Sequence, residues 1–275
     1  MDRLSTLLSH FGVSAGTFHS GTFCGTTGFD GEQAYGHLHL LKAGELTLKL
    51  ADERDIQLNE PTLIFFPRPF RHRLFAAETS DTQLVCASLT FDGGAGNALA
   101  AALPDYLVLG LDEIPSMTGT LDWLFNEAFG GTCGREAMMD RLFEVLVIQL
   151  LRHLLANHQQ KTGMMAGLAD PRLARSLSLM HDTPGNAWTV AELSAAANMS
   201  RASFAEYFRQ VVGQTPVDYL VSWRISLAQK RLREGKSIAL IADEVGYESP
   251  SALARAFRRK TGVSPREWMR NGKER

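Results

Sequence analysis

Two stretches near the C-terminus decide how this chain folds. Residues 189–213 read TVAELSAAANMSRASFAEYFRQVVG, and residues 237–262 read SIALIADEVGYESPSALARAFRRKTG. In the first stretch we expect a short helix after the N-cap candidate Thr189 and a second helix after Ser200, with a turn of only a few residues between them. Two helices joined so tightly must cross at a large angle, which is the geometry of a helix-turn-helix.

The second stretch repeats the first. At an offset of 49 positions, aromatic, basic, glycine and proline residues coincide: Phe208, Arg209, Gly213, Pro216 and Tyr219 correspond to Phe257, Arg258, Gly262, Pro265 and Trp268. Upstream the offset shortens to 48, because Val190, Leu193 and Ser194 correspond to Ile238, Ile241 and Ala242. One structural unit is therefore predicted twice, with a difference of one residue at a turn.

A third helix is predicted between the two copies, over residues 216–236 (PVDYLVSWRISLAQKRLREGK). Its apolar residues recur at helical spacing, so one face packs inward and holds the two copies at a set distance. If that distance matches one turn of DNA, both second helices can enter successive major grooves.

The charges are divided unevenly along the chain. From residue 168 onward there are 17 Lys and Arg against 11 Asp and Glu, a net charge of +6, whereas the part before it carries −8. This contrast favours a polyanionic partner for the C-terminal part. The N-terminus lacks the pattern of a secretory signal or a spanning helix, so we expect a cytoplasmic protein with no membrane partner. The three cysteines show no paired spacing and are expected to be thiols.

The first half has a different pattern. Short apolar runs over residues 33–91, separated by turn residues, predict an antiparallel sandwich or small barrel. Apolar residues at helical spacing predict helices over 116–129 and 135–158. Helix breakers at 161–171 mark the domain boundary. We therefore predict an α+β multidomain fold, with a β-barrel and helices in residues 1–165 and an all-α domain with two helix-turn-helix motifs in residues 166–275.

The C-terminal motifs resemble a known family. MSRASFAEYFR (199–209), GQTPVDYL (213–220) and IADEVGYESPSALARAFRRKTGVSPREWMR (241–270) are similar to the DNA-binding domain of the AraC/XylS transcription regulators, over roughly residues 170–270. The chain departs from the family pattern at Leu253, where an aromatic residue is commoner. The resemblance implies a sequence-specific transcription regulator, an activator rather than a repressor, with promoter DNA and RNA polymerase as partners.

The resemblance also implies which residues face DNA. In the first recognition helix, about 200–211, these are Ser200, Arg201, Ala202, Ala205, Glu206 and Arg209. In the second, about 249–260, they are Pro250, Ser251, Ala252, Arg255 and Arg259. Arg201 and Arg255 are the best candidates for guanine, because a guanidinium matches its O6 and N7 acceptors. Arg209 and Arg259 are expected on phosphates, which fix the register of the protein on the duplex. Glu206 could accept a hydrogen bond from cytosine.

Members of this family commonly carry a cupin-like barrel followed by dimerisation helices, so a homodimer is expected. Residues 36–45 (GHLHLLKAGE) place His37 and His39 on one strand face, and His72 follows a neighbouring apolar run. Metal-binding cupins use such an HxH pair with a later His, which makes these three candidate ligands of a divalent metal ion. Glu45 lies too far along for the cupin pattern. No other cofactor is implied, and a barrel that binds a small-molecule effector is the alternative.

Thiol chemistry is a second possible trigger. The N-terminal half is similar in layout to the cupin-type regulators that respond to reactive chlorine, through MDRLSTLL (1–8), PRPFRHRL (67–74) and the cysteines Cys24 and Cys86. In that branch a cysteine pair at such places reports oxidation. The simpler interpretation of Cys86 is a small core residue. The sequence offers no counterpart for Cys133.

We do not expect an enzyme. No HExxH, phosphate-binding loop or dinucleotide fingerprint is present. The competing hypothesis from another class is a cupin enzyme, such as a dioxygenase or isomerase, fused to a DNA-binding tail.

Overall fold

The computed structural model describes residues 2–51, 54–93, 97–157 and 161–273, and it separates into two compact units. The β unit comprises Val13–Gly94 and Leu103–His153, and the helical unit comprises Met1–Gly12, Ala95–Ala102 and Leu154–Arg275. The α+β multidomain class predicted from the sequence is confirmed. Among the described residues, no helix has the length and apolar character needed to cross a membrane.

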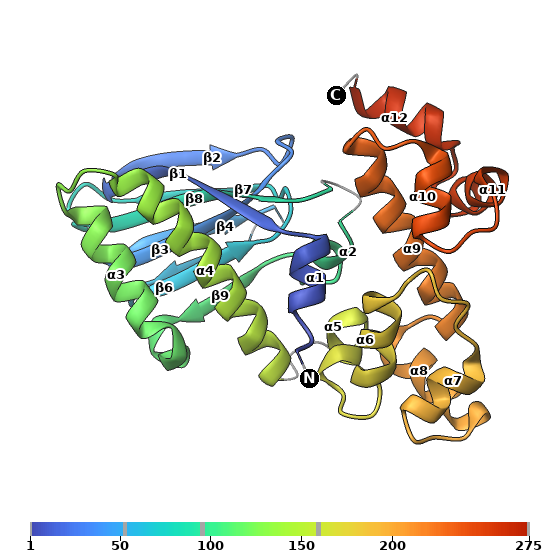
Figure 1. Cartoon of the computed structure of the whole chain (residues 1–275). Coiled ribbons are helices and arrows are strands. Elements are labelled where there is room, and N and C mark those ends of the chain that lie inside the picture. The colour runs from blue at the N-terminus through green and yellow to red at the C-terminus, as the bar shows by residue number, and fades with distance from the viewer. Residues whose placement is uncertain (1, 52–53, 94–96, 158–160, 274–275) are drawn as a thin grey trace. The chain divides into compact units, whose positions relative to one another are not determined.

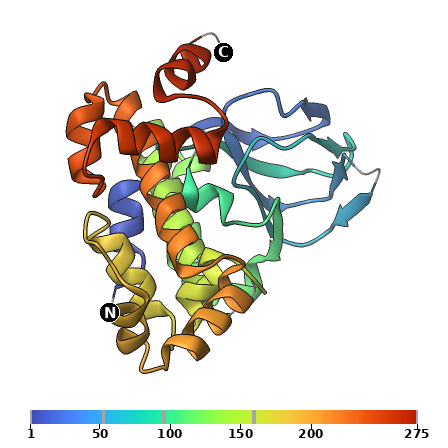
Figure 2. The ribbon, with the colours of Figure 1, turned by 90° about the vertical axis from the view of Figure 1, so that its right-hand side faces the viewer.

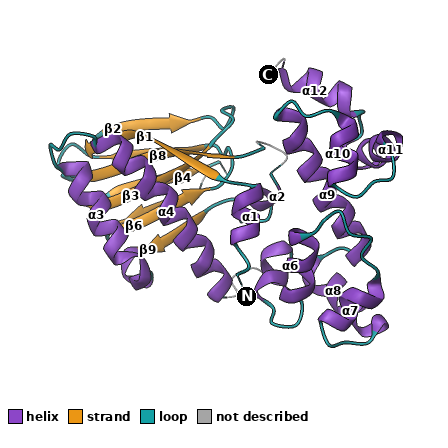
Figure 3. Cartoon of the chain, viewed as in Figure 1, coloured by secondary structure: helices purple, strands orange, loops and turns teal. Residues whose placement is uncertain are grey.

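The β unit is built from two antiparallel sheets (Figures 1 and 3). The strand order is β1-β8-β3-β6-β9 in the larger sheet and β2-β7-β4-β5 in the smaller one. The bounds are β1 Val13–Thr22, β2 Gly25–Phe29, β3 Gly36–Ala43, β4 Leu46–Leu50, β5 Asp55–Leu58, β6 Thr62–Phe66, β7 His72–Ala76, β8 Gln83–Phe91 and β9 Leu107–Gly110. Strands therefore begin well before residue 33, where the sequence pattern first predicted them.

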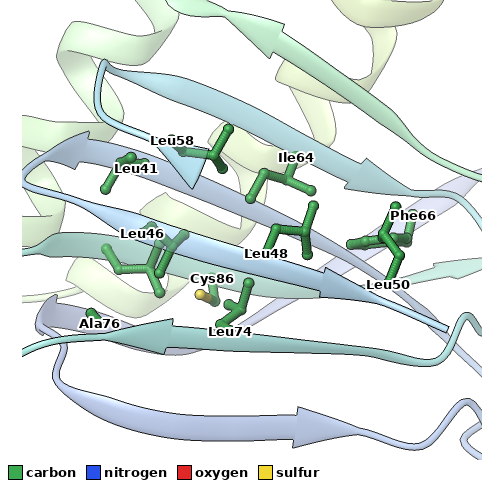
Figure 4. Close-up of a cluster of buried hydrophobic side chains, with 11 residues drawn as sticks. Leu41, Leu46, Leu48, Leu50, Leu58, Ile64, Phe66, Leu74, Ala76 and Cys86 are labelled. Carbon is green, nitrogen blue, oxygen red and sulfur yellow. The ribbon is translucent and has the colours of Figure 1, made fainter. Parts of the chain in front are cut away.

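The core of the β unit lies between the two sheets. Side chains from both sheets meet there (Figure 4): Leu41, Ile64, Phe66, Leu84 and Cys86 from the larger sheet, and Leu46, Leu48, Leu50, Leu58, Leu74 and Ala76 from the smaller one. The larger sheet is also buried on its other face, because Leu38, Leu40 and Phe65 are fully buried. Strands buried on both faces read as continuous apolar runs, which explains why β3 and β6 lack alternation.

Helices follow the strands of this unit. They are α3 (Thr118–Phe129) and α4 (Arg135–Ala156), which continues past the end of the unit. Both helices were predicted, although residue 158 of the expected range lies outside the described residues. The α4 residue Asp140 accepts hydrogen bonds from the backbone N–H of Thr17, at 2.7 Å, and from its hydroxyl, at 2.9 Å. Because β1 is an edge strand, this cover satisfies a backbone donor that would otherwise be open to pairing with another chain.

The helical unit contains the two predicted helix-turn-helix copies. The first is α7 (Val190–Ala196) with α8 (Arg201–Val212), and the second is α10 (Ile238–Glu244) with α11 (Pro250–Thr261). The long helix α9 (Pro216–Arg233) connects them and is seen side-on in Figure 2, in orange. The remaining helices are α1 Ser5–His10, α2 Ala98–Ala101, α5 Met164–Ala169, α6 Ala174–Asp182 and α12 Pro265–Lys273.

Local signals begin and end these helices as the sequence indicated. The hydroxyls of Thr189 and Ser200 accept hydrogen bonds from the backbone of the first turns of α7 and α8, and Ser249 does the same for α11. Both α8 and α11 end at a glycine in the left-handed region, Gly213 at φ 83° and Gly262 at φ 82°. The N-caps predicted at Thr189 and Ser200 are confirmed.

The turn inside each copy also uses a left-handed residue. It is Asn198 at φ 54° in the first copy and Gly246 at φ 75° in the second, 48 positions later. From there one residue follows before the cap Ser200, but two follow before Ser249, so the change of offset from 48 to 49 lies in this turn. A Cβ at Gly246 would lie 2.3 Å from the Gly185 carbonyl oxygen, which explains why only the second copy requires glycine.

The boundaries of the two compact units differ from those of the predicted domains, 1–165 and 166–275. The helix α1 precedes the first strand in the chain but belongs to the helical unit. Phe11, at its end, is fully buried with its ring centroid 5.2 Å from that of Trp223 on α9, and the Lys230 ammonium donates to the His10 carbonyl. A six-residue helix cannot bury its own apolar side chains, so it packs where a larger core accepts them.

Candidate DNA-binding surface and sensor site

The second helices of the two copies each have one buried and one open side. Phe204 and Phe208 on α8, and Phe257 on α11, are fully buried against the rest of the unit. The positions assigned to DNA by resemblance are exposed or half-buried: Ser200, Arg201, Ala202, Ala205, Glu206 and Arg209 on α8, and Pro250, Ser251, Ala252, Arg255 and Arg259 on α11. The residue types that could read bases therefore lie away from the core.

The arginine side chains on this open side have no protein partner among the described residues. Among the described residues, the side chains of Arg201, Arg209, Arg255 and Arg259 form no hydrogen bond or ion pair, and the Glu206 side chain accepts a hydrogen bond only from Gln210, at 3.2 Å. A guanidinium without a protein partner retains five donors for phosphate oxygens or for guanine. We call the exposed positions of α8 and α11 the recognition surface.

Arg224 has a structural role, unlike the arginines of the recognition surface, and the sequence did not reveal this role. It donates hydrogen bonds to three carbonyl oxygens: those of Pro184 at 2.7 Å, Asn186 at 2.8 Å and Gly246 at 3.3 Å. Pro184 and Asn186 precede the first copy, and Gly246 lies in the turn of the second. Partial burial lowers the pKa of Arg224, but its side chain stays charged because its usual pKa is so high. This arginine thus fixes the two copies relative to one another from the linker helix α9.

In the β unit, the predicted histidines come together inside the sandwich. His37, His39 and His72 are buried, and the Nε2 atoms of His39 and His72 lie 3.0 Å apart. The ring centroid of His37 is 5.4 Å from that of His72 and 5.7 Å from that of His39. The Phe66 ring stacks on His72 at 3.9 Å. Desolvation lowers the pKa of His37 and of His72 to about 4, so both imidazoles are neutral at pH 7.

The hydrogen bonds fix the protons of this pair. His72 Nδ1 lies 2.8 Å from the Phe70 carbonyl oxygen, which can only accept, so Nδ1 carries the proton and Nε2 is a lone pair. His39 must then donate its Nε2–H to His72. Burial, the largest cause, and the neighbouring imidazoles lower the pKa of His39 well below its usual value, so this ring is neutral too and its Nδ1 is an acceptor. No described group donates to that nitrogen, and His37 Nδ1 and His19 Nε2 are also buried without a partner.

These positions fit a metal ion poorly as they stand. Two imidazole nitrogens converge, but among the described residues no group of three His, Cys, Asp or Glu side chains is placed to hold a metal ion. A transition-metal site in a protein takes three or four such ligands. The metal role of His37, His39 and His72 therefore stays a prediction, and we derive no step from a metal.

The two cysteines of the predicted redox pair lie in different environments. Cys24 is exposed in the connection between β1 and β2, and Cys86 is buried on β8, where desolvation raises its pKa well above the usual value. The register pairs Cys86 with His19. From there the end of β1, at Thr22, is already about 10 Å further along, whereas a disulfide needs its Cα atoms within about 7 Å. Direct Cys24–Cys86 bonding would require β1 to move.

The comparisons with known proteins agree with this arrangement. A family model described as Cupin matches residues 2–156, more than half of the chain, and one described as Helix-turn-helix domain matches residues 193–271. Two proteins named putative AraC-like transcription regulators are similar to the chain. One, from Streptomyces antibioticus, is 43% identical over 46% of this chain and 44% of its own length. The other, from Streptomyces lividans, is 34% identical over 71% of this chain and 66% of its own length. The chain thus spans less than half of the first and just under two thirds of the second.

A further relative is covered more completely. The RCS-specific HTH-type transcriptional activator RclR of Escherichia coli (strain K12) is 30% identical over 86% of this chain and 85% of its own length. A match of that length includes both halves of the chain. The chain belongs to the AraC-type transcription regulators that carry an N-terminal cupin domain.

Proposed function

We propose that this chain is an activator that binds promoter DNA in the cytoplasm through both copies of its helix-turn-helix motif. The observation that carries the proposal is the recognition surface, where two serine-capped helices present four arginines without partners among the described residues. Arg201 and Arg255 read guanine, and Arg209 and Arg259 bind phosphates. The name of RclR, an activator, supports activation rather than repression.

The test is Arg255→Ala, with footprinting of the upstream region of the gene and titration of a matching duplex. A guanine-specific guanidinium contributes about 1–3 kcal/mol, so we expect specific affinity to fall about ten- to a hundredfold and specificity to relax at one base pair. Arg175→Ala on α6 is the matched control, because this exposed arginine lies outside the recognition surface. Unchanged binding by Arg255→Ala would rule out the assignment of α11.

A homodimer is part of the proposal. The helices α3 and α4 carry large apolar side chains in solvent: Trp123 is 53% exposed, Val145 44%, and Phe129 and Met138 38% each. Apolar surface of this kind favours association. A second copy of the chain would place four recognition helices on one promoter, and RNA polymerase is the partner that activation requires.

We propose that oxidation of Cys24 is the signal. Its thiol is exposed and therefore accessible to an oxidant, and RclR is named RCS-specific. Few residues separate Cys24 from the helical unit. Cys24 follows the C-terminal end of β1, and the N-terminal end of β1 follows Phe11, the C-cap of α1. The Phe11 ring packs on Trp223 of the linker helix α9. A shift of β1 along its own axis would therefore pull on the helical unit.

A promoter–reporter strain tests this signal. Cys24→Ser should remove the response to hypochlorite, whereas Cys133→Ser, which changes the other exposed cysteine, should leave it intact. Cys86→Ser tests whether Cys86 takes part in the response as well. Its buried thiol has a raised pKa and therefore contributes little of the reactive thiolate. A full response in Cys24→Ser would exclude that cysteine as the sensor.

The second candidate signal is a small effector inside the sandwich. The unpartnered nitrogens of His37, His39 and His19 support it, since buried polar atoms without partners are rare in folded proteins. The His39 ring limits which effectors can bind. Its Nδ1 is a hydrogen-bond acceptor, so an effector that contacts it must donate a hydrogen bond. Induction of the reporter by a hydrogen-bonding metabolite in the Cys24→Ser strain would favour this candidate over the oxidant.

A further inference from the structure

A hollow of about 400 Å³ on the β unit is lined by three basic side chains and one carboxylate. Its lining comprises Lys49, Leu50, Ala51, Asp55, Arg71, His72 and Arg73. The carboxylate is already engaged, because Asp55 lies 3.3 Å from the Lys49 ammonium. Among the described residues, the side chains of Arg71 and Arg73 form no hydrogen bond or ion pair. Two guanidiniums are thus left over in one concave site.

The strand register places Arg73 directly opposite another positive charge. On β7, His72 points into the sandwich and the next residue, Arg73, points out. Across the smaller sheet Arg73 pairs with Lys49 on β4, and on the other side with Gly28 on β2. Like charges directly opposite one another destabilise a sheet.

We infer that this hollow binds a small oxyanion, a carboxylate or a phosphate, through the guanidiniums of Arg71 and Arg73. Planar guanidiniums form paired, charge-assisted hydrogen bonds with both kinds of group. The volume lies within the range of small-molecule sites, whereas a nucleic acid backbone is normally followed by an extended groove. An adjacent hollow that also includes both arginines is lined by Asp30 and Glu32, so the anion is expected on the Lys49 side.

His72 contributes to the lining of the hollow, but its side chain is buried and points into the sandwich, where its ring accepts the hydrogen bond from His39. This binding site goes beyond the proposed function and does not depend on Cys24, so Cys24→Ser should keep the anion affinity, whatever its effect on the oxidant response.

The experiment is isothermal titration calorimetry of the full-length protein with sodium phosphate, sodium sulfate and sodium succinate, at an ionic strength held constant with sodium chloride. We expect saturable binding of at least one of them, and the preferred probe separates a phosphorylated ligand from a carboxylated one. Arg73→Gln and Arg71→Gln should each weaken it about ten- to a hundredfold. Arg152→Gln, which changes an exposed arginine of α4, should not.

Circular dichroism of each variant establishes that it is folded, as expected for exposed side chains. The inference is overturned if none of the three anions binds saturably, or if Arg73→Gln binds them as tightly as the unchanged protein. Titration of a short duplex DNA gives the remaining outcome. If both arginine variants lose affinity for DNA while no small anion binds, the surface is a nucleic acid contact and the small-ligand site is wrong.

Discussion

Among the described residues, the β unit buries three histidines and the helical unit buries one, and the two units use the ring nitrogens differently. In the helical unit, His181 Nε2 lies 2.6 Å from the Tyr219 hydroxyl, and the ring packs on Trp223 at 4.1 Å. In the β unit, His37 and His39 each leave a buried nitrogen without a partner. An unmet buried hydrogen-bonding group lowers stability, so it persists where something else needs it. The contrast is confined to the histidines, because Ser178 Oγ, Trp223 Nε1 and Tyr247 OH of the helical unit are also buried without a partner among the described residues. It supports the proposal that the β unit receives a small molecule.

The largest effect on stability and on DNA binding should follow from a substitution in the core of the helical unit. Phe257→Ala removes a fully buried ring between α11 and α12, where Trp268 lies 5.8 Å away. Such truncations lower the free energy of unfolding by about 3–5 kcal/mol. We expect loss of specific DNA binding together with an earlier urea transition. Phe75→Ala, at an exposed phenylalanine of the β unit, is the control. Equal effects of the two variants would mean that the second copy is not the rigid element described above.

A matched pair of substitutions addresses the contrast directly. His181→Leu leaves the buried Tyr219 hydroxyl without its hydrogen-bond partner, so it should lower the free energy of unfolding by about 1–3 kcal/mol. His37→Leu removes a buried nitrogen that has no partner, so stability should stay the same or rise. Urea denaturation of both variants at pH 7.5 measures this. A destabilised His37→Leu would show that His37 is already satisfied, for example by ordered water.

The last effect concerns pH. The pKa of His37 and His72 falls to about 4 in the folded state, from an ordinary value near 6.5. Between these values the unfolded chain binds more protons than the folded one, so stability is greatest above about pH 6.5 and is lost as the pH falls towards 4. We expect the two groups together to cost on the order of a few kcal/mol of stability between pH 7 and pH 5.

Urea midpoints measured across this range check the expectation. His37→Leu should flatten the pH dependence, since one of the titrating groups is gone. His181, whose pKa burial lowers to about 3, should contribute in the same direction, so His181→Leu is the necessary comparison. A pH dependence that is unchanged in both variants would contradict the assignment.

Much of the helical unit could be predicted because its signals are local. Thr189 and Ser200 begin helices through their own side chains, and the internal repeat located the turn in which the copies differ by one residue. The β unit was less predictable. The strand β1 (VSAGTFHSGT) and the strand β2 (GTTGF) are rich in Gly, Ser and Thr and lack the apolar alternation by which the later strands were recognised. Their pairing with β8 and β7 stabilises them instead.

By itself the sequence determined the kind of protein: a duplicated helix-turn-helix behind a β domain with histidines and cysteines. Spacing within a helix or a turn is enough for that, because those contacts join neighbours in the chain. Only the tertiary structure decided which distant groups meet. His39 and His72 are 33 residues apart, Arg73 faces Lys49 through the register of two strands, and α1 lies in the helical unit. These contacts depend on how separate elements pack, which no local pattern fixes.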